Sequence, residues 1–166
     1  MAIAKWIKTI GVSFIGLTFW ATAQAGVVTC GDSYRTASLA SAESCEAQTI
    51  GSTAKKADID AIFGGSWTKV GEVKAAGAND WLSITGWGSS TASGTWAIDP
   101  AFWLTYGSAV ISIHVGGGQK DAVDNFEWLV TPETLSGTWS YSKLTGKGGG
   151  LSNIKLWGSG TPTVDV

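Results

Sequence analysis

One stretch of the chain alternates two kinds of side chain at the spacing of a β-strand, in which neighbouring residues point to opposite faces. Leu82 and Ile84 share one face, and the other face carries two indoles and two hydroxyls, those of Trp81, Ser83, Thr85 and Trp87. An indole offers a flat apolar surface to a sugar ring, and hydroxyl side chains bond sugar hydroxyls, so this pattern indicates a carbohydrate-binding face. The alternative, which the high average burial of tryptophan favours, is that both indoles pack against a second sheet or cover a sheet edge.

Residues for catalysis are present but are not arranged in a recognisable pattern. His114 is the only histidine, it falls in a predicted strand, and the chain has no nucleophile-elbow sequence, so neither a Ser/His/Asp triad nor a histidine-based metal site is indicated. A glycosidase needs two carboxylates on opposite sides of a bond. Five acids are available and none lies in such a motif: Asp99, Asp121, Asp124, Glu127 and Glu133. We therefore expect a protein that is not an enzyme and has no cofactor.

Two groups of aspartates raise the question of a metal site. Asp58 and Asp60 lie on a predicted helix, and the glycine loop 116–118 is followed by Asp121 and Asp124. Neither group matches the ligand spacing and internal glycine of an EF-hand loop, nor a calcium-binding nonapeptide repeat. We expect no metal, with a solvated helix face and ordinary turn geometry as the explanations.

The chain has two cysteines, Cys30 and Cys45. In an oxidising compartment an even count without other partners indicates one disulfide, which would tether a loop near the N-terminus. The rival interpretation, a two-cysteine metal or redox site, lacks both a CxxC spacing and a nearby histidine.

The N-terminus has the features of a secretory leader. Lys5 and Lys8 precede the mostly apolar run 10–20, and small residues stand at Ala23 and Ala25. The run is too short to span a bilayer, so we expect cleavage after Ala25 and no membrane span in the mature chain. The alternative is a membrane anchor that stays attached.

Residues 26–166 then form a chain of single-domain length that can bury about two thirds of its unfolded surface. Nine basic and thirteen acidic residues remain, a net charge of −4, and Arg35 is the only arginine. Because phosphate binding depends on clustered lysine and arginine, nucleic acid is not an expected partner.

The hydrophobic periodicity predicts an all-β domain, an antiparallel sandwich of jelly-roll type with one short N-terminal helix. The helix is expected over 54–63 and is stopped by Gly64-Gly65. In the run Ala109 to Val115 every second residue is apolar, which marks one face as core. Strands are expected over 66–74, 79–87, 95–99, 109–115, 125–130 and 151–157, with an entry strand and the tethered cysteine loop over 27–51.

A four-residue phrase, Ser-Gly-Thr-Trp, occurs at 93–96 and again at 136–139, on either side of the run 109–115. Ser-Gly is typical of a turn, and Thr-Trp is typical of the beginning of a strand. We predict that both copies are turns that lead into strands. Because only four residues match, an internal duplication is not indicated.

The order of these motifs resembles that of secreted PEP-CTERM proteins, which are exosortase substrates of Gram-negative bacteria that make extracellular polysaccharide. The likeness runs over 63–158, through Phe63-Gly64-Gly65-Ser66-Trp67-Thr68, the two Ser-Gly-Thr-Trp phrases, the apolar strand that ends in glycines at 110–117, and the last strand at 151–158. It implies a β-sandwich domain in the extracellular matrix or on the cell surface. The family's sorting tail is absent from this sequence, which ends Thr161-Pro162-Thr163-Val164-Asp165-Val166, so we expect either a released, tail-less relative or a piece of a longer chain.

Three functions remain open. The first is a secreted, non-enzymatic matrix or cell-surface protein that acts in biofilm or floc structure or in adhesion. The second is a carbohydrate-binding module that uses Trp81, Ser83, Thr85 and Trp87 on an extracellular polysaccharide. The third is a fibre subunit that self-associates through exposed sheet edges, for which the uncharged strand 109–115 is the candidate edge.

Overall fold

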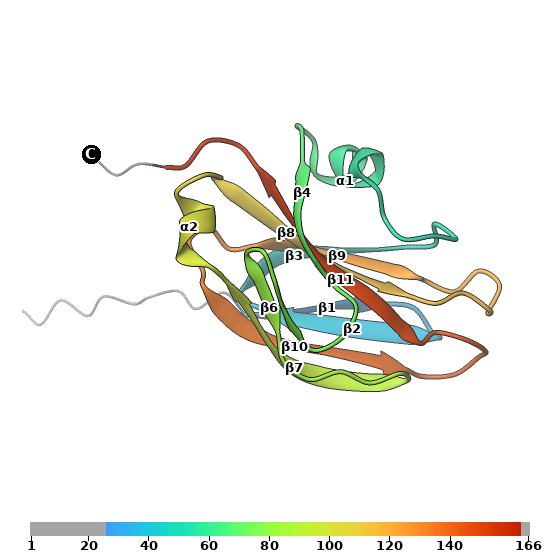
Figure 1. Cartoon of the computed structure of the whole chain (residues 1–166). Coiled ribbons are helices and arrows are strands. Elements are labelled where there is room, and N and C mark those ends of the chain that lie inside the picture. The colour runs from blue at the N-terminus through green and yellow to red at the C-terminus, as the bar shows by residue number, and fades with distance from the viewer. Residues whose placement is uncertain (1–25, 164–166) are drawn as a thin grey trace, which may run out of the picture.

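The computed structural model describes residues 26–163, so the predicted leader at 1–25 lies outside the described residues. Two antiparallel sheets pack face to face (Figure 1), which confirms the predicted all-β sandwich. Sheet A has six strands in the order β1 (Val27–Gly31), β2 (Arg35–Ala40), β10 (Ser136–Lys143), β7 (Thr91–Ile98), β6 (Leu82–Ile84) and β5 (Gly77–Asn79). Sheet B has five strands in the order β3 (Ala42–Gln48), β9 (Asn125–Val130), β8 (Ser108–Val115), β11 (Leu151–Ser159) and β4 (Thr68–Val73).

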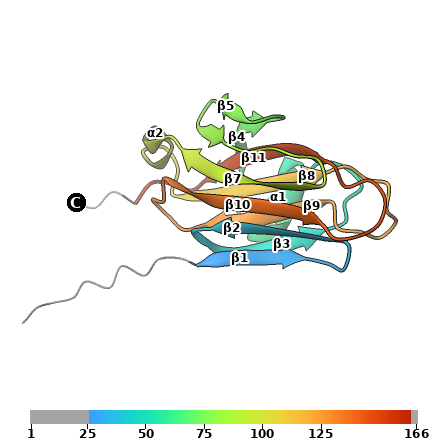
Figure 2. The ribbon, with the colours of Figure 1, turned by 90° about the horizontal axis from the view of Figure 1, so that it is seen from below.

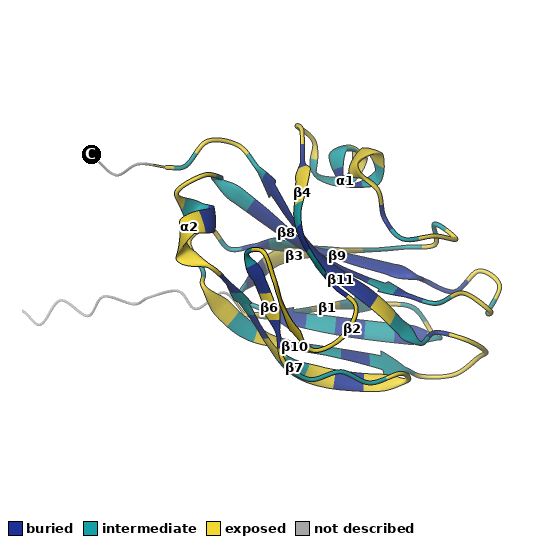
Figure 3. Cartoon of the chain, viewed as in Figure 1, coloured by how far each residue is buried: buried dark blue, intermediate teal, exposed yellow. Residues whose placement is uncertain are grey.

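The main core lies between the two sheets, where most inward residues are apolar. Arg35 of β2 is a buried exception. Figure 3 shows the resulting alternation of buried and exposed positions along the strands of sheet A. The predicted core face of the run 109–115 is confirmed, because alternate residues from Ala109 to Val115 are fully buried. Several of the largest core side chains are aromatic: Trp96, Phe102, Phe126, Trp128 and Tyr141.

The predicted disulfide between Cys30 and Cys45 is present, with the two Cα atoms 6.0 Å apart. Its surroundings differ from the expected tethered loop, because the segment contributes three strands, β1, β2 and β3. Cys30 lies in β1 of sheet A and Cys45 in β3 of sheet B. The disulfide therefore joins the two sheets at one side of the sandwich.

Two further strand predictions need correction. The segment 79–87 is not one strand, because the chain reverses at Asp80 and Trp81 so that Asn79 pairs with Leu82 across β5 and β6. Asp80 has a left-handed φ of 51°, a conformation that aspartate tolerates better than most residues. The run 109–115 belongs to β8, which lies between β9 and β11 and is therefore a central strand and not an edge.

The two Ser-Gly-Thr-Trp phrases lie side by side, because β7 and β10 are antiparallel neighbours. Thr95 pairs with Thr138, Gly94 with Trp139, and Trp96 with Gly137. The second phrase begins a strand, as predicted, but its Ser136 and Gly137 already pair within β10, and the first phrase lies inside β7, so the prediction of a turn is wrong for both copies. A Cβ atom at Gly137 would come within 2.7 Å of Trp96 Nε1, so this glycine leaves room beside the indole of the other phrase. A Cβ atom at Gly94 would instead collide with the backbone oxygen of Thr85.

The outer face of sheet B is partly covered by the loop 49–55 and by α1 (Lys56–Phe63), which confirms the predicted helix. Gly64 ends the helix with a φ of 71°, as predicted. The shorter α2 (Pro100–Trp103) lies between β7 and β8 in the chain. A second, small apolar cluster holds α1 and the loop on the sheet: Ala54, Ile59, Trp67, Val110 and Trp157.

Candidate functional site

The outer face of sheet A is covered by hydroxyl side chains, and Figure 2 views the molecule from this side. On β2, β7 and β10 the outward residues are exposed or half-buried, while their inward neighbours are buried. We call this surface the hydroxyl face and define it by its serines and threonines: Thr29, Thr36, Ser38, Ser83, Thr85, Thr91, Ser93, Thr95, Thr138, Ser140 and Ser142. None of these positions carries a charge.

The strand register aligns the hydroxyls in rows that cross the sheet. In one row Thr29 pairs with Ser38, Ser38 with Ser140, and Ser140 with Ser93, so that four neighbouring strands contribute one hydroxyl each. Thr29 Oγ1 and Ser38 Oγ lie 2.7 Å apart within hydrogen-bonding distance. Since strands lie about 4.8 Å apart and every second residue along a strand lies about 7 Å further on, the rows form a regular array.

The same arrangement continues toward β6 through three threonines. Thr138 pairs with Thr95, and Thr95 Oγ1 lies 2.7 Å from Thr85 Oγ1. The backbone nitrogen of Thr95 also donates to Thr85 Oγ1. These bonds hold the threonine side chains in fixed orientations on the surface.

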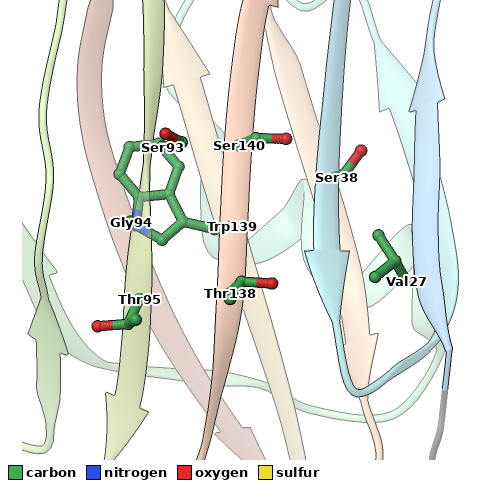
Figure 4. Close-up of a pocket in the computed structure, with 8 residues that line it drawn as sticks. All are labelled: Val27, Ser38, Ser93, Gly94, Thr95, Thr138, Trp139 and Ser140. Atoms are coloured by element: carbon green, nitrogen blue, oxygen red, sulfur yellow. The ribbon is translucent and has the colours of Figure 1, made fainter.

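A shallow depression of about 420 Å³ lies at the centre of the hydroxyl face. Figure 4 shows Ser38, Thr138 and Ser140 on neighbouring strands, with Ser93 and Thr95 on β7. Gly94 and Trp139 also line the depression. The Trp139 side chain is buried, and its Nε1 donates a hydrogen bond to the backbone oxygen of Thr85. The depression is open on one side and is lined by three neighbouring strands and the start of β1, so it can take the side of a long molecule.

The predicted carbohydrate-binding residues divide into two groups. Ser83 and Thr85 are exposed and belong to the hydroxyl face, while Leu82 and Ile84 are buried on the core side as predicted. The structure therefore brings the two predicted hydroxyls together with a larger set of serines and threonines on β2, β7 and β10.

The two predicted indoles are half-buried and make their aromatic contacts with different partners. Trp81 packs edge-on against Phe102, with ring centroids 5.7 Å apart, and against Tyr106 at 5.8 Å. Trp87 packs against Trp139 at 6.5 Å. Both indoles thus have packing roles in separate aromatic clusters. Trp81 keeps one side open to a depression that it shares with Val70, Asp80 and Tyr106.

The sequence did contain a signal for the larger surface. In 136–142 small polar residues alternate with Trp139 and Tyr141, and in 35–39 Thr36 and Ser38 alternate with buried residues. This periodicity identifies a half-buried strand with a polar outer face. The periodicity does not show which strands are neighbours, because strand pairing in a sandwich joins residues that are far apart in the chain.

The outer face of sheet B holds two buried ionisable groups, Glu127 and Lys155. Glu127, Ser112 and Lys155 form a row across β9, β8 and β11. Glu127 has an exposure of 0%, and neither of its carboxylate oxygens has a hydrogen-bond partner. Burial, together with the negative charges of Asp58, Asp124 and Glu46, raises the pKa of Glu127 to about 8.

His114 and two of the candidate catalytic acids, Asp124 and Asp99, have defined local surroundings. Burial lowers the pKa of His114, and its buried Nδ1 has no partner. The carboxylate of Asp124 accepts from the backbone of Ile50 and Gly51, and Asp99 accepts from the backbone of Ala101 in α2. These two acids therefore hold local structure.

Three comparisons, with protein-family models, with curated proteins and with solved structures, find no match to this chain. Within residues 26–163 no helix is long and apolar enough to cross a membrane. Over the same residues no three histidine, cysteine or acidic side chains are grouped so that they could hold a metal ion.

Proposed function

We propose that this chain is a secreted, non-enzymatic protein of the extracellular matrix that binds a neutral polysaccharide through the hydroxyl face. The observation that carries the proposal is the row of Thr29, Ser38, Ser140 and Ser93 across four neighbouring strands. A polymer chain that lies across the strands meets a hydroxyl at every strand, so many weak contacts add along its length.

The chemistry of this face fits a neutral polysaccharide. A serine or threonine hydroxyl donates one hydrogen bond and accepts two, as a sugar hydroxyl does, so either partner can take either role. Threonine methyl groups, together with Val27, Ala40 and Ala97 on the same side of the sheet, offer apolar contacts to the C–H groups of a sugar ring. The lack of charge at the hydroxyl positions favours a neutral polymer over an acidic one.

Secretion is part of the same proposal. The features that support it are the leader-like sequence at 1–25 and the Cys30–Cys45 disulfide, since disulfides persist in oxidising compartments. The resemblance to PEP-CTERM proteins supports residence in a polysaccharide matrix of a Gram-negative bacterium, with a role in biofilm or floc structure or in adhesion.

Co-sedimentation of residues 26–166 with insoluble neutral polysaccharides, cellulose and chitin, tests the proposal. Ser93→Lys combined with Ser140→Lys puts two charged, flexible side chains in the middle of the hydroxyl row, and we expect this variant to stay in the supernatant. Ser44→Lys is the matched control, because Ser44 is an exposed serine on β3 of the opposite sheet. Failure of the wild type to sediment with either polymer, or equal loss of binding in the control, would contradict the proposal.

The aromatic depression beside Trp81 offers a competing site for the same ligand class. Trp81→Ala removes the indole that lines this depression and leaves the hydroxyl rows in place. We expect Trp81→Ala to sediment as the wild type does. Loss of binding in a Trp81→Ala protein that remains folded by circular dichroism would move the site from the hydroxyl face to the aromatic depression.

A further inference from the structure

A second surface of the molecule gathers positively charged side chains. On the outer side of sheet B, where Figure 1 shows α1 beside β4, a groove of about 370 Å³ runs between α1, β4 and β11. We call it the lysine groove and define it by four lysines and two indoles: Lys55, Lys56, Lys69, Lys155, Trp67 and Trp157. No carboxylate lines it.

Lys155 is the central group of the lysine groove, and it is buried without a counter-ion. Only 6% of the residue is exposed. Its Nζ donates to Thr53 Oγ1 at 2.8 Å and to Ala54 O at 3.0 Å, which leaves one of its three donors free. Across residues 26–163 no carboxylate lies within ion-pair distance of this ammonium group.

A buried ammonium group without an anion is costly, because the charge has lost its water and gained no opposite charge. Burial lowers the pKa of Lys155, and the cross-strand Glu72 only partly offsets that effect. Glu72 is itself paired with Lys69, at 2.7 Å. An anion in the groove would supply the missing charge.

The remaining residues form the apolar walls of the lysine groove and its charged rim. Trp67 and Trp157 are 4% and 3% exposed and form apolar walls, and the indole of Trp157 lies 5.7 Å from Lys155 Nζ. Lys55, Lys56 and Lys69 are exposed along the rim. Lys56 is paired with Asp60, whereas Lys55, at the helix end of the groove, forms no ion pair with any residue of 26–163.

We propose that the lysine groove binds the carboxylate groups of an acidic polysaccharide, with one carboxylate seated on Lys155 and the next held by the rim lysines. The apolar walls suit a sugar ring, and several cations along an open groove suit a repeating anion better than a single ion. This site lies on the opposite sheet from the hydroxyl face and takes a ligand of different charge, so it goes beyond the function proposed above. A protein with both sites would join a neutral polymer to an acidic one.

Affinity gel electrophoresis of residues 26–166 in polygalacturonate tests this inference, with dextran as the uncharged polymer. We expect polygalacturonate to retard the wild type and dextran to leave its mobility unchanged, with retardation falling as salt rises. Lys155→Met, which keeps most of the side-chain length, is expected to weaken binding by about tenfold or more. Lys74→Met is the matched control, because Lys74 is an exposed lysine just beyond β4 that does not line the groove.

A second variant keeps the test decisive if Lys155→Met does not fold. Lys55→Gln combined with Lys69→Gln changes only exposed rim residues, and it is expected to lose most of the retardation while remaining folded. No retardation of the wild type, or equal loss in Lys74→Met, would overturn the inference. Displacement of polygalacturonate by inorganic phosphate at equal anion concentration would also overturn it, because the groove would then be a site for small free anions.

The two proposals fail separately. The lysine variants are expected to sediment with cellulose or chitin as the wild type does, and Ser93→Lys with Ser140→Lys is expected to keep its retardation in polygalacturonate. Loss of both activities in every variant would instead indicate general unfolding, which circular dichroism detects.

Discussion

The outer faces of the two sheets are made by the same strand alternation but have opposite properties. The hydroxyl face of sheet A is open to solvent and uncharged, and its polar groups satisfy one another or water. On sheet B, α1 and the loop 49–55 cover the same kind of outward positions, so Glu127 and Lys155 are buried there. Polar groups on a solvent-exposed face cost little free energy of folding because water can bind them. Each polar group on a covered face needs a partner within the protein.

Glu127 gives the largest expected effect, because it is a buried acid on the covered face. Its pKa is about 8 in the folded chain and about 4.5 in the unfolded chain, so folding takes up a proton between these values. Stability is therefore lost as pH rises from about 4.5 to about 8, by an amount on the order of 5 kcal/mol. We expect Glu127→Gln to abolish this loss, so that the variant is more stable than the wild type at pH 9.

Denaturant unfolding from pH 5 to pH 9 measures this effect as the difference between the two proteins. Taking the difference cancels His114, whose lowered pKa works in the other direction and removes stability as pH falls through about 6.5. Glu46→Gln, at the exposed position that pairs with Glu127, is the control and should retain the alkaline loss. A wild type whose stability is the same at pH 5 and pH 9 would contradict the buried-acid interpretation.

Loss of the disulfide has the second largest expected effect on stability, and it affects both sheets. Cys30 and Cys45 are 15 residues apart, and the loop-closure entropy for such a span is about 3 kcal/mol. Replacing both by serine should lower the free energy of unfolding by about this amount. Because the disulfide joins sheet A to sheet B, hydrogen exchange should rise in β1 and in β3 together. A rise confined to one of them would show that the sheets are not coupled through this link.

Asn125 attaches the loop 49–55 to the outer face of sheet B. Its Oδ1 accepts from the Ala54 nitrogen at 3.0 Å and its Nδ2 donates to Ser52 O at 2.8 Å, so one side chain fixes the loop before α1. Asn125→Ala leaves these backbone groups without partners, and we expect a loss of about 2 kcal/mol with faster hydrogen exchange at Ala54. Binding to cellulose or chitin should not change, since the hydroxyl face is on the other sheet. An unchanged exchange rate at Ala54 would contradict the role given to Asn125.

Thr95 gives the smallest expected effect, because it lies on the open face. Thr95→Val removes the hydrogen bond to Thr85 Oγ1 and keeps the branched shape that suits a strand. Both partners are exposed and water can replace the bond, so thermal unfolding should change by less than about 0.5 kcal/mol. A loss as large as that of Asn125→Ala would remove the contrast between the two faces.

Short-range pattern predicted much of this architecture. The 3.6-residue spacing before Gly64-Gly65 predicted α1, and alternation predicted β9 and the core side of β8. Alternation also placed Ser83 and Thr85 on the outward side and Leu82 and Ile84 on the inward side. These features depend on neighbours in the chain, so the sequence contains them directly.

Long-range pairing accounts for the predictions that were wrong or incomplete. The cysteine loop became three strands because β2 pairs with β10, which lies about a hundred residues further along, and no local pattern indicates that pairing. The hydroxyl face is assembled in the same way, from β1, β2, β6, β7 and β10. Glu127 looked like one acid among several, and only the cover of α1 and its loop makes its environment apolar.

The pairing of the two Ser-Gly-Thr-Trp phrases has a consequence for how the sequence can vary. Because Gly137 leaves room for the indole of Trp96, a larger residue at one position requires a smaller aromatic, or none, at the other. Trp139 and Gly94 also pair across the same two strands, but a Cβ atom at Gly94 would collide with the Thr85 backbone oxygen. In relatives of this chain, substitutions at positions 96 and 137 should therefore be correlated, whereas position 94 should remain glycine. The two phrases have the same sequence, but their glycines meet different steric requirements.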